Sequence, residues 1–209
     1  MQMKKNLCAG MIALAGFVLW TMAVCHVDIQ PIGPVGSEVG FATLNGWFHE
    51  LTGVHMGLYI LTDWLSLIPV AVVLGFGLLG LLQWVKWKKI WNVDRSILVL
   101  GGFYLAVLAF FVLFEILEIN YRPVLIEGAL EASYPSSTTL LVLTVMPVAG
   151  MELGRRVKNS TWILWANHVY TGFMVTARTL SGVHWLTDII GGVLLSVALI
   201  SFYSAFAEE

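Results

Sequence analysis

Hydrophobic residues in this chain gather into six long runs that polar segments separate. The runs extend over residues 7–25, 57–82, 96–117, 136–153, 161–179 and 184–205. A helix of about 20 apolar residues spans the hydrocarbon core of a bilayer, and each run reaches or approaches that length. The pattern therefore predicts an all-α integral membrane bundle of six transmembrane helices.

Two of the six runs are less typical of lipid-facing spans. Polar residues such as Asn167 and Thr171 interrupt the fifth run, which favours a helix buried among other helices. The first run follows Lys4 and Lys5, as in a secretory signal peptide. It is longer than such a signal and lacks a convincing small-residue cleavage site, so we expect a retained span.

Composition agrees with a membrane protein and narrows its partners. The chain has 209 residues, of which 58% are hydrophobic and 11% charged, and its mean hydropathy is +0.84. A soluble globular domain is far less apolar. The net charge of −2 offers no electrostatic surface for nucleic acid. No linker or internal repeat divides the sequence, so we expect residues 1–209 to form a single membrane domain surrounded by lipids.

Basic residues indicate how the bundle is oriented, because Lys and Arg accumulate in short cytoplasmic loops. Nine of the eleven lie before the first run or between runs two and three and runs four and five. They are Lys4, Lys5, Lys86, Lys88, Lys89, Arg95, Arg155, Arg156 and Lys158. We expect a cytoplasmic N-terminus, in the cell membrane, with the other two basic residues, Arg122 and Arg178, at the extracytoplasmic face.

The segment between the first two runs is expected to lie at the same outer face. Its second half places apolar residues, including Trp47 and Leu51, on one helical face and His49 on the other, a pattern typical of an interfacial helix. This helix is placed to roof a site. His49 and His55 show no spacing of metal ligands, and we expect neither a metal nor a cofactor.

Three short motifs lie at the outer ends of the runs in the C-terminal half. They are Tyr121-Arg122-Pro123, the segment Tyr134-Pro135-Ser136-Ser137-Thr138-Thr139, and the segment from Arg178 to Asp188. Proline and hydroxyl residues at a helix start can cap the free amides. Such a start binds anions through its unpaired N–H groups and its dipole.

His184 and Asp188 are four residues apart at a predicted helix start, so the carboxylate can reach the imidazole. A carboxylate that holds one ring nitrogen leaves the other free to attack an electrophile. Arginines match the oxygens of phosphate, and Arg122 and Arg178 lie at the same face. The alternative is a buried His–Asp pair that only ties helices together.

These motifs resemble those of the type 2 phosphatidic acid phosphatase and vanadium haloperoxidase superfamily, in its membrane lipid phosphate phosphatase branch. That family carries Lys-x6-Arg-Pro, Pro-Ser-Gly-His and Ser-Arg-x5-His-x3-Asp, which this chain matches in part within residues 115–188. The resemblance implies that His184 is the phosphate-accepting nucleophile and Asp188 its orienting partner. It also implies that Arg122, Ser136, Ser137 and Arg178 bind phosphate.

The chain departs from the family pattern at positions that matter for chemistry, so its second motif is degenerate. Glu115 replaces the lysine of the first motif, and Ser137 and Thr138 replace the glycine and histidine of the second. The family's histidine protonates the leaving group, which threonine cannot do near neutral pH. Glu115 either pairs with Arg122 in the empty site or is a protonated, neutral carboxyl.

The sequence favours a membrane hydrolase that removes phosphate from a lipid phosphate or diphosphate, such as a polyprenyl diphosphate, through a phosphohistidine at the extracytoplasmic face. The main alternative is an impaired relative that binds lipid phosphates without hydrolysing them. A transporter built around the acids Asp63, Glu115 and Glu118 is a weaker alternative, because no repeated or broken helix pair surrounds them. A haloperoxidase is less apt for a chain that is nearly all membrane helix.

Overall fold

Eight α-helices and two 3₁₀ turns form the regular structure in the computed structural model, which describes residues 1–158 and 161–207. The elements are α1 (Gln2–His26), η1 (Pro34–Gly36), α2 (Ala42–Thr52), α3 (Met56–Leu65), α4 (Leu67–Trp87), η2 (Ile90–Asn92), α5 (Arg95–Leu117), α6 (Ser137–Arg156), α7 (Thr161–Leu180) and α8 (Leu186–Ala207). The predicted all-α bundle is confirmed.

Five helical stretches in the described residues are long and apolar enough to cross a bilayer, with α3 and α4 counted as one stretch. The chain is therefore an integral membrane protein. α7 is the long helix that does not meet this standard of apolarity, so a sixth span stays a prediction. Its buried Asn167 donates to the carbonyl of Met146 in α6 at 2.6 Å. The polar residues of α7 thus include one that joins two helices of the bundle.

A break separates α3 from α4, where the sequence predicts one continuous helix over residues 57–82. Ser66 is the junction, and Pro69 occupies the first turn of α4. A proline ring clashes with the carbonyl of the residue four positions earlier, here Leu65, and it provides no N–H donor. The apolar run therefore continues across the break while the helix does not.

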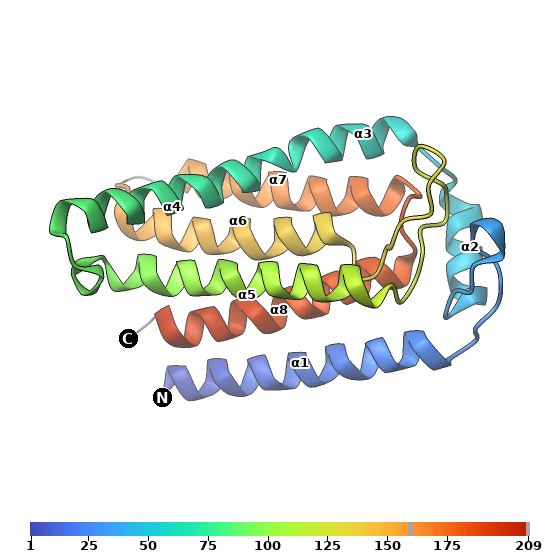
Figure 1. The fold of residues 1–209 in the computed structure, drawn as a ribbon, viewed down its shortest axis with the longest axis horizontal. Helices are drawn as coiled ribbons and strands as arrows, with labels where there is room; N and C mark the ends of the chain where they lie inside the picture. Colours follow the sequence, from blue (N-terminus) through green and yellow to red (C-terminus); the bar gives the residue numbers. More distant parts are fainter. Residues whose placement is uncertain (159–160, 208–209) are drawn as a thin grey trace.

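The long helices lie side by side with both termini at one end of the bundle (Figure 1). α1 packs along α8, and α6 contacts α4, α5, α7 and α8. The start of α1, the α4–α5 connection and the end of α6 lie at the end that holds the termini. These segments carry the nine basic residues, and the three motifs lie at the opposite end.

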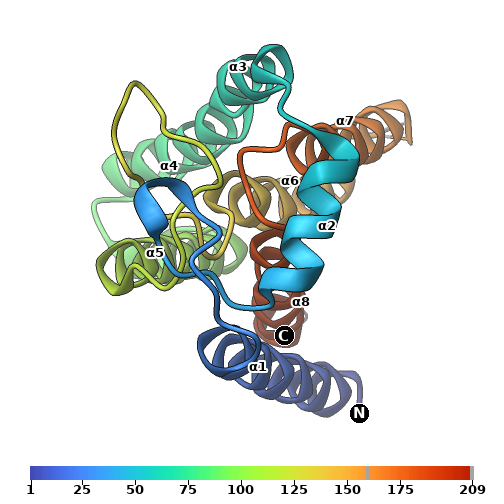
Figure 2. The same ribbon diagram turned by 90° about the vertical axis from the view of Figure 1, so that its right-hand side faces the viewer.

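The predicted outer helix is α2, which lies across the motif-bearing end of the bundle (Figure 2). Its inward residue is Asn45, whose amide donates to the Thr187 hydroxyl at 2.9 Å and accepts from the Thr187 N–H at 3.2 Å. Trp47 and Leu51 are exposed on the outward side. A polar contact with the start of α8 therefore fixes α2 in place.

Candidate active site

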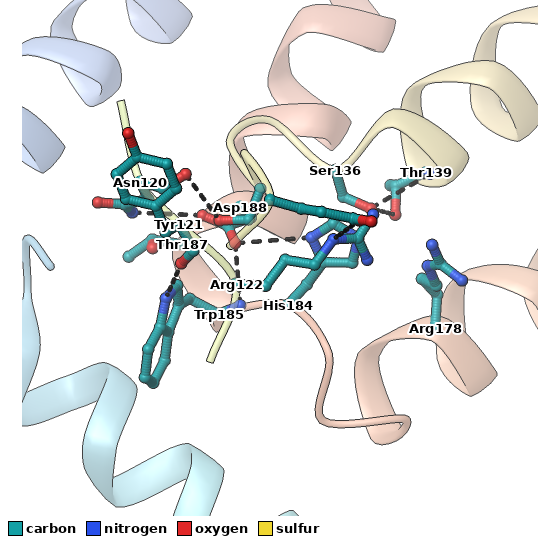
Figure 3. Close-up of polar contacts among 12 residues, drawn as sticks. Asn120, Tyr121, Arg122, Ser136, Thr139, Arg178, His184, Trp185, Thr187 and Asp188 are labelled. Carbon is teal, nitrogen blue, oxygen red and sulfur yellow. Dashed lines mark hydrogen bonds and ion pairs between the residues drawn. The ribbon is translucent and has the colours of Figure 1, made fainter. Parts of the chain in front are cut away.

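His184 lies in the loop between α7 and α8, and Asp188 lies in the first turn of α8 (Figure 3). α8 begins at Leu186, so the expected start at residue 184 is two residues early. The reason is local: Asp188 Oδ2 accepts the N–H of Trp185 at 2.9 Å and closes the helix start as in a capping box. His184 Nδ1 lies 3.6 Å from the same oxygen, just beyond hydrogen-bond distance.

The other ring nitrogen of His184 faces Arg122. Arg122 Nη1 lies 3.4 Å from His184 Nε2. A guanidinium only donates hydrogen bonds, so Nε2 is the acceptor and the ring proton is on Nδ1, beside Asp188. Burial, and next the charges of Arg122 and Arg178, hold the pKa of His184 well below its usual value. The imidazole is therefore neutral near pH 7, which is the form that a nucleophile requires.

Asn120, in the loop between α5 and α6, holds the carboxylate of Asp188. Its amide donates to Asp188 Oδ1 at 3.3 Å, and both residues are buried. Asp188 thus has its two oxygens held by Asn120 and the Trp185 backbone. Sequence reasoning missed Asn120, whose position two residues before Arg122 was the available signal.

Arg178, in the last turn of α7, is a cation buried with few partners, since 2% of it is exposed. Nη1 donates to the Thr62 hydroxyl at 3.2 Å, and the guanidinium lies 4.8 Å from the centre of the Tyr59 ring. Nε is buried without a hydrogen-bond partner in the described part of the chain. A buried charge is costly without an opposite charge, so this arrangement favours an anionic ligand.

Arg122 pairs with Glu131, a residue that sequence reasoning missed. Nε lies 3.0 Å from Glu131 Oε2. The loop between α5 and α6 folds back on itself, so the Arg122 N–H donates to the Glu131 carbonyl at 3.0 Å and the two side chains lie together. Pairing of Arg122 with Glu115, one of the two alternatives given above for Glu115, is not what the structure shows. Glu115 instead lines a cavity of about 140 Å³ with Arg122, Glu131 and Ser137.

The second motif forms the start of α6. Ser136 is the N-cap, and its hydroxyl accepts from the Thr139 hydroxyl at 3.0 Å. The Ser136 N–H donates to the Asp188 carbonyl at 3.0 Å, so this residue ties α6 to α8. The next amides, at Ser137 and Thr138, occupy the first helical positions, which have no partner within the helix. They are the donors that α6 offers to an anion.

A much larger cavity, of about 910 Å³, extends away from this point between α4, α5 and α6. Asp63, Ser137 and Thr138 line it at the motif-bearing end, and Trp84 and Ile90 line it at the other end. The side chains between them are mostly apolar. Thr138, which stands where the family has its acid, therefore faces a hydrophobic groove.

Gly182 allows the loop before His184 to pass close to the segment between α2 and α3. Its φ of 69° belongs to the left-handed region that glycine adopts without strain. A Cβ at this position would lie 2.0 Å from the Gly53 carbonyl oxygen. The Ser181 carbonyl next to it accepts from the His55 N–H at 2.9 Å. Close backbone contact with the segment between α2 and α3 thus holds the loop.

The three motifs therefore meet in space, although they are distributed over more than sixty residues. In Figure 3 the Arg122 side chain lies against His184, Asp188 lies on one side of this pair, and Arg178 and the start of α6 lie on the other. The group is largely buried. Two guanidiniums, a neutral imidazole and free helix amides can hold a tetrahedral dianion and attack it.

Comparison with known proteins gives a consistent result. Residues 116–209 match the family model of the PAP2 superfamily. A solved structure, the first transmembrane PAP2-type phosphatidylglycerolphosphate phosphatase from Bacillus subtilis, is similar over 94% of each chain, with a TM-score of 0.52 and 20% identity. No curated protein sequence shows a significant match. Residues 116–209 are therefore similar to the PAP2 superfamily, and the chain as a whole has the fold of this transmembrane protein.

Proposed function

We propose that this protein is a membrane phosphatase that removes phosphate from a lipid phosphate or diphosphate through a phosphohistidine at His184. The observation that carries the proposal is a neutral, buried imidazole that contacts Arg122 and lies near enough to Arg178 to feel its charge. Two buried guanidiniums attract a phosphate dianion, and Nε2 of the imidazole lies next to one of them, that of Arg122. The similarity of residues 116–209 to the PAP2 superfamily supports the same interpretation.

In the first step Nε2 of His184 attacks phosphorus while the bond to the leaving oxygen breaks. Arg122, Arg178 and the first amides of α6 balance the charge on the phosphoryl oxygens as it moves. Asp188 faces the Nδ1 proton and stabilises the positive ring that forms. The distance of 3.6 Å between His184 Nδ1 and Asp188 Oδ2 is expected to shorten when the dianion is bound.

The leaving group decides which substrate this site turns over best. Thr138 cannot protonate an alkoxide, which is a poor leaving group. The lipid monophosphate that departs from a diphosphate is a far better one, since its negative charge is already stabilised on the phosphate oxygens. A lipid diphosphate, such as a polyprenyl diphosphate, is therefore the substrate class that fits the missing acid.

A lipid fits the site because the 910 Å³ groove runs from the start of α6 along apolar helix faces. Burying a CH₂ group in such surroundings contributes about 0.8 kcal/mol, so a long chain gains substantial affinity there. The structurally similar Bacillus subtilis protein also bears the name of a lipid phosphatase. We place the reaction at the extracytoplasmic face, because the nine basic residues lie at the other end of the bundle.

Phosphate release by the purified protein tests this function. The wild type and His184→Ala are assayed in detergent micelles with a polyprenyl diphosphate and with phosphatidic acid. We expect phosphate release by the wild type and a loss of at least 1,000-fold in the variant, since the nucleophile is gone. Equal release by both proteins would exclude His184 as the nucleophile.

The competing function is a lipid-phosphate binder without turnover, which the substitutions at Glu115 and Thr138 favour. Arg122 and Arg178 would then act only as a clamp for the headgroup. A wild type that binds a lipid diphosphate tightly and releases no phosphate would support this function. Arg178→Ala should weaken binding in both cases, so turnover is the quantity that separates them.

A further inference from the structure

Asp63 is an acidic residue inside a stretch that is expected to cross the membrane. It lies near the end of α3, is exposed, and lines the large groove between α4, α5 and α6. A carboxylate at this depth is costly, and such residues mark sites of function more often than not. The reaction described above gives Asp63 no role.

The surroundings of Asp63 place it beside the phosphate site. The preceding residue, Thr62, accepts the hydrogen bond from Arg178 at 3.2 Å, and Tyr59 stacks on the same guanidinium. Asp63 is close enough to Arg178 for their charges to interact. It lines the groove together with Ser137 and Thr138. α3 and the start of α6 both lie toward the motif-bearing end of the bundle (Figure 1), where Asp63 and Thr138 line the same groove.

Hydrolysis of a phosphohistidine requires a water molecule that approaches phosphorus from one particular side. Displacement at phosphorus is in line, so water attacks from the side opposite Nε2 of His184. That side is the one from which the lipid leaving group has departed. With the lipid chain in the groove, as proposed above, that side is the part of the groove lined by Asp63, Ser137 and Thr138.

We propose that Asp63 is the general base that activates water for hydrolysis of the phosphohistidine, an inference that rests on the function proposed above. The water oxygen forms a bond to phosphorus, and its proton passes to the Asp63 carboxylate. The bond from phosphorus to Nε2 breaks, and its electron pair returns to His184. Orthophosphate leaves, and Asp63 then gives the proton to solvent.

Other carboxylates near the site are less suited to this step. Glu131 is in an ion pair with Arg122 at 3.0 Å. Glu115 lines the small cavity on the Arg122 side rather than the groove. Glu118 accepts from the Tyr121 hydroxyl at 2.8 Å and lines neither cavity. Among the described residues that line the groove, Asp63 is the carboxylate.

The test separates the two halves of the reaction in the Asp63→Asn variant. The purified protein is mixed with a polyprenyl diphosphate radiolabelled on its terminal phosphate, and both bound label and released phosphate are followed. We expect the variant to become labelled at nearly the wild-type rate, to accumulate close to one label per chain, and to release phosphate about 100- to 10,000-fold more slowly. Asp63→Glu, which keeps a base, should recover part of the release.

Two controls make the outcome specific. Glu118→Gln removes a carboxylate from the same end of the bundle and should change neither rate. His184→Ala should take up no label. Thermal unfolding of each variant, compared with the wild type, shows whether the fold is intact.

Three results would overturn the proposal. Unchanged phosphate release in Asp63→Asn would show that this residue is not the base. Equal loss of labelling and release in a folded variant would place Asp63 in binding or in the first step. A wild type that releases phosphate without ever becoming labelled would exclude the phosphohistidine itself, and the role of Asp63 with it.

Discussion

Each reactive group of the site depends on one or two neighbours that set its state. Asp188 is held by Asn120 and the Trp185 N–H, and Arg122 is held by Glu131. His184 has Arg122 at one nitrogen and Asp188 near the other. The chemistry therefore follows from single contacts, which single substitutions can test.

The protonation state of His184 is the first such prediction. Its pKa is lowered by burial and next by the charges of Arg122 and Arg178. A lowered pKa means that the ring stays neutral as the pH falls through 6.5 and becomes protonated only at lower pH. The chain has five histidines, so NMR of ¹⁵N-labelled histidine, with His184→Gln to assign the signal, measures this directly. A ring that is half protonated at or above pH 6.5 would contradict the proposed site.

Thr138→His restores the acid that the second motif lacks, and it is predicted to alter substrate preference. A histidine near the leaving oxygen helps the departure of an alkoxide more than that of a lipid monophosphate, because only the alkoxide needs a proton. Hydrolysis of phosphatidic acid should therefore rise by about 10- to 1,000-fold, and that of a polyprenyl diphosphate by much less. Parallel assays measure both. An equal gain on the two substrates, or a wild type that prefers phosphatidic acid, would refute the explanation.

The sequence indicates the motif residues of the site but not the residues that surround them. Spacing alone brings His184 and Asp188 together, since they are four positions apart. Tyr59 and Thr62 reach the site through the packing of a distant segment, which no local pattern encodes. Of the two alternatives for Glu115, pairing with Arg122 is not the one found, because the fold of the loop between α5 and α6 brings Glu131 to that arginine.

At the scale of the elements, the starts of α6 and α8 position several residues of the site. α6 begins next to α8, and the N–H of Ser136 donates to the Asp188 carbonyl. α2 fixes the start of α8 through Asn45 and Thr187. The apolar runs predict the long helices to within a few residues, because length and hydropathy determine a span. The break before α4 and the start of α8 depend on Pro69 and on the Asp188 cap.

Asn45→Ala tests whether α2 holds the start of α8 in place. Asn45 is buried and makes hydrogen bonds to Thr187 and to the Gly40 carbonyl. Removing its amide leaves buried groups unpaired, which should cost about 1–3 kcal/mol in unfolding free energy. We expect a lower thermal unfolding temperature and slower phosphate release. Thr43→Ala, an exposed change in the same helix, is the control and should have almost no effect. A stable and fully active Asn45→Ala would argue against this role.

For the whole molecule, the distribution of charge leads to the prediction of an outward-facing site. The basic residues and both termini lie at one end of the bundle, and the three motifs lie at the other. Composition indicates a membrane bundle without any structural knowledge. It does not indicate the groove, because the space between α4, α5 and α6 depends on how the helices diverge.

Single cysteines report the orientation in intact cells. Cys8 and Cys25 are first replaced by serine, and one cysteine is then introduced at Lys88 or at Glu127. A maleimide that does not cross membranes should label Glu127→Cys from outside, because Glu127 is exposed on the loop between α5 and α6. Lys88→Cys should react only after the cells are permeabilised. The reverse pattern would place the site in the cytoplasm.

The central claim is that a phosphoryl group is bonded to His184 during turnover. The most direct test is to mix the protein with a polyprenyl diphosphate, stop the reaction in alkali, in which phosphohistidine is stable while acid destroys it, and locate the phosphate by mass spectrometry of the peptides. We predict one phosphorylated residue, His184, whose adduct is absent in His184→Ala. Phosphate release with no modified histidine, or with phosphate on another residue, would contradict the account.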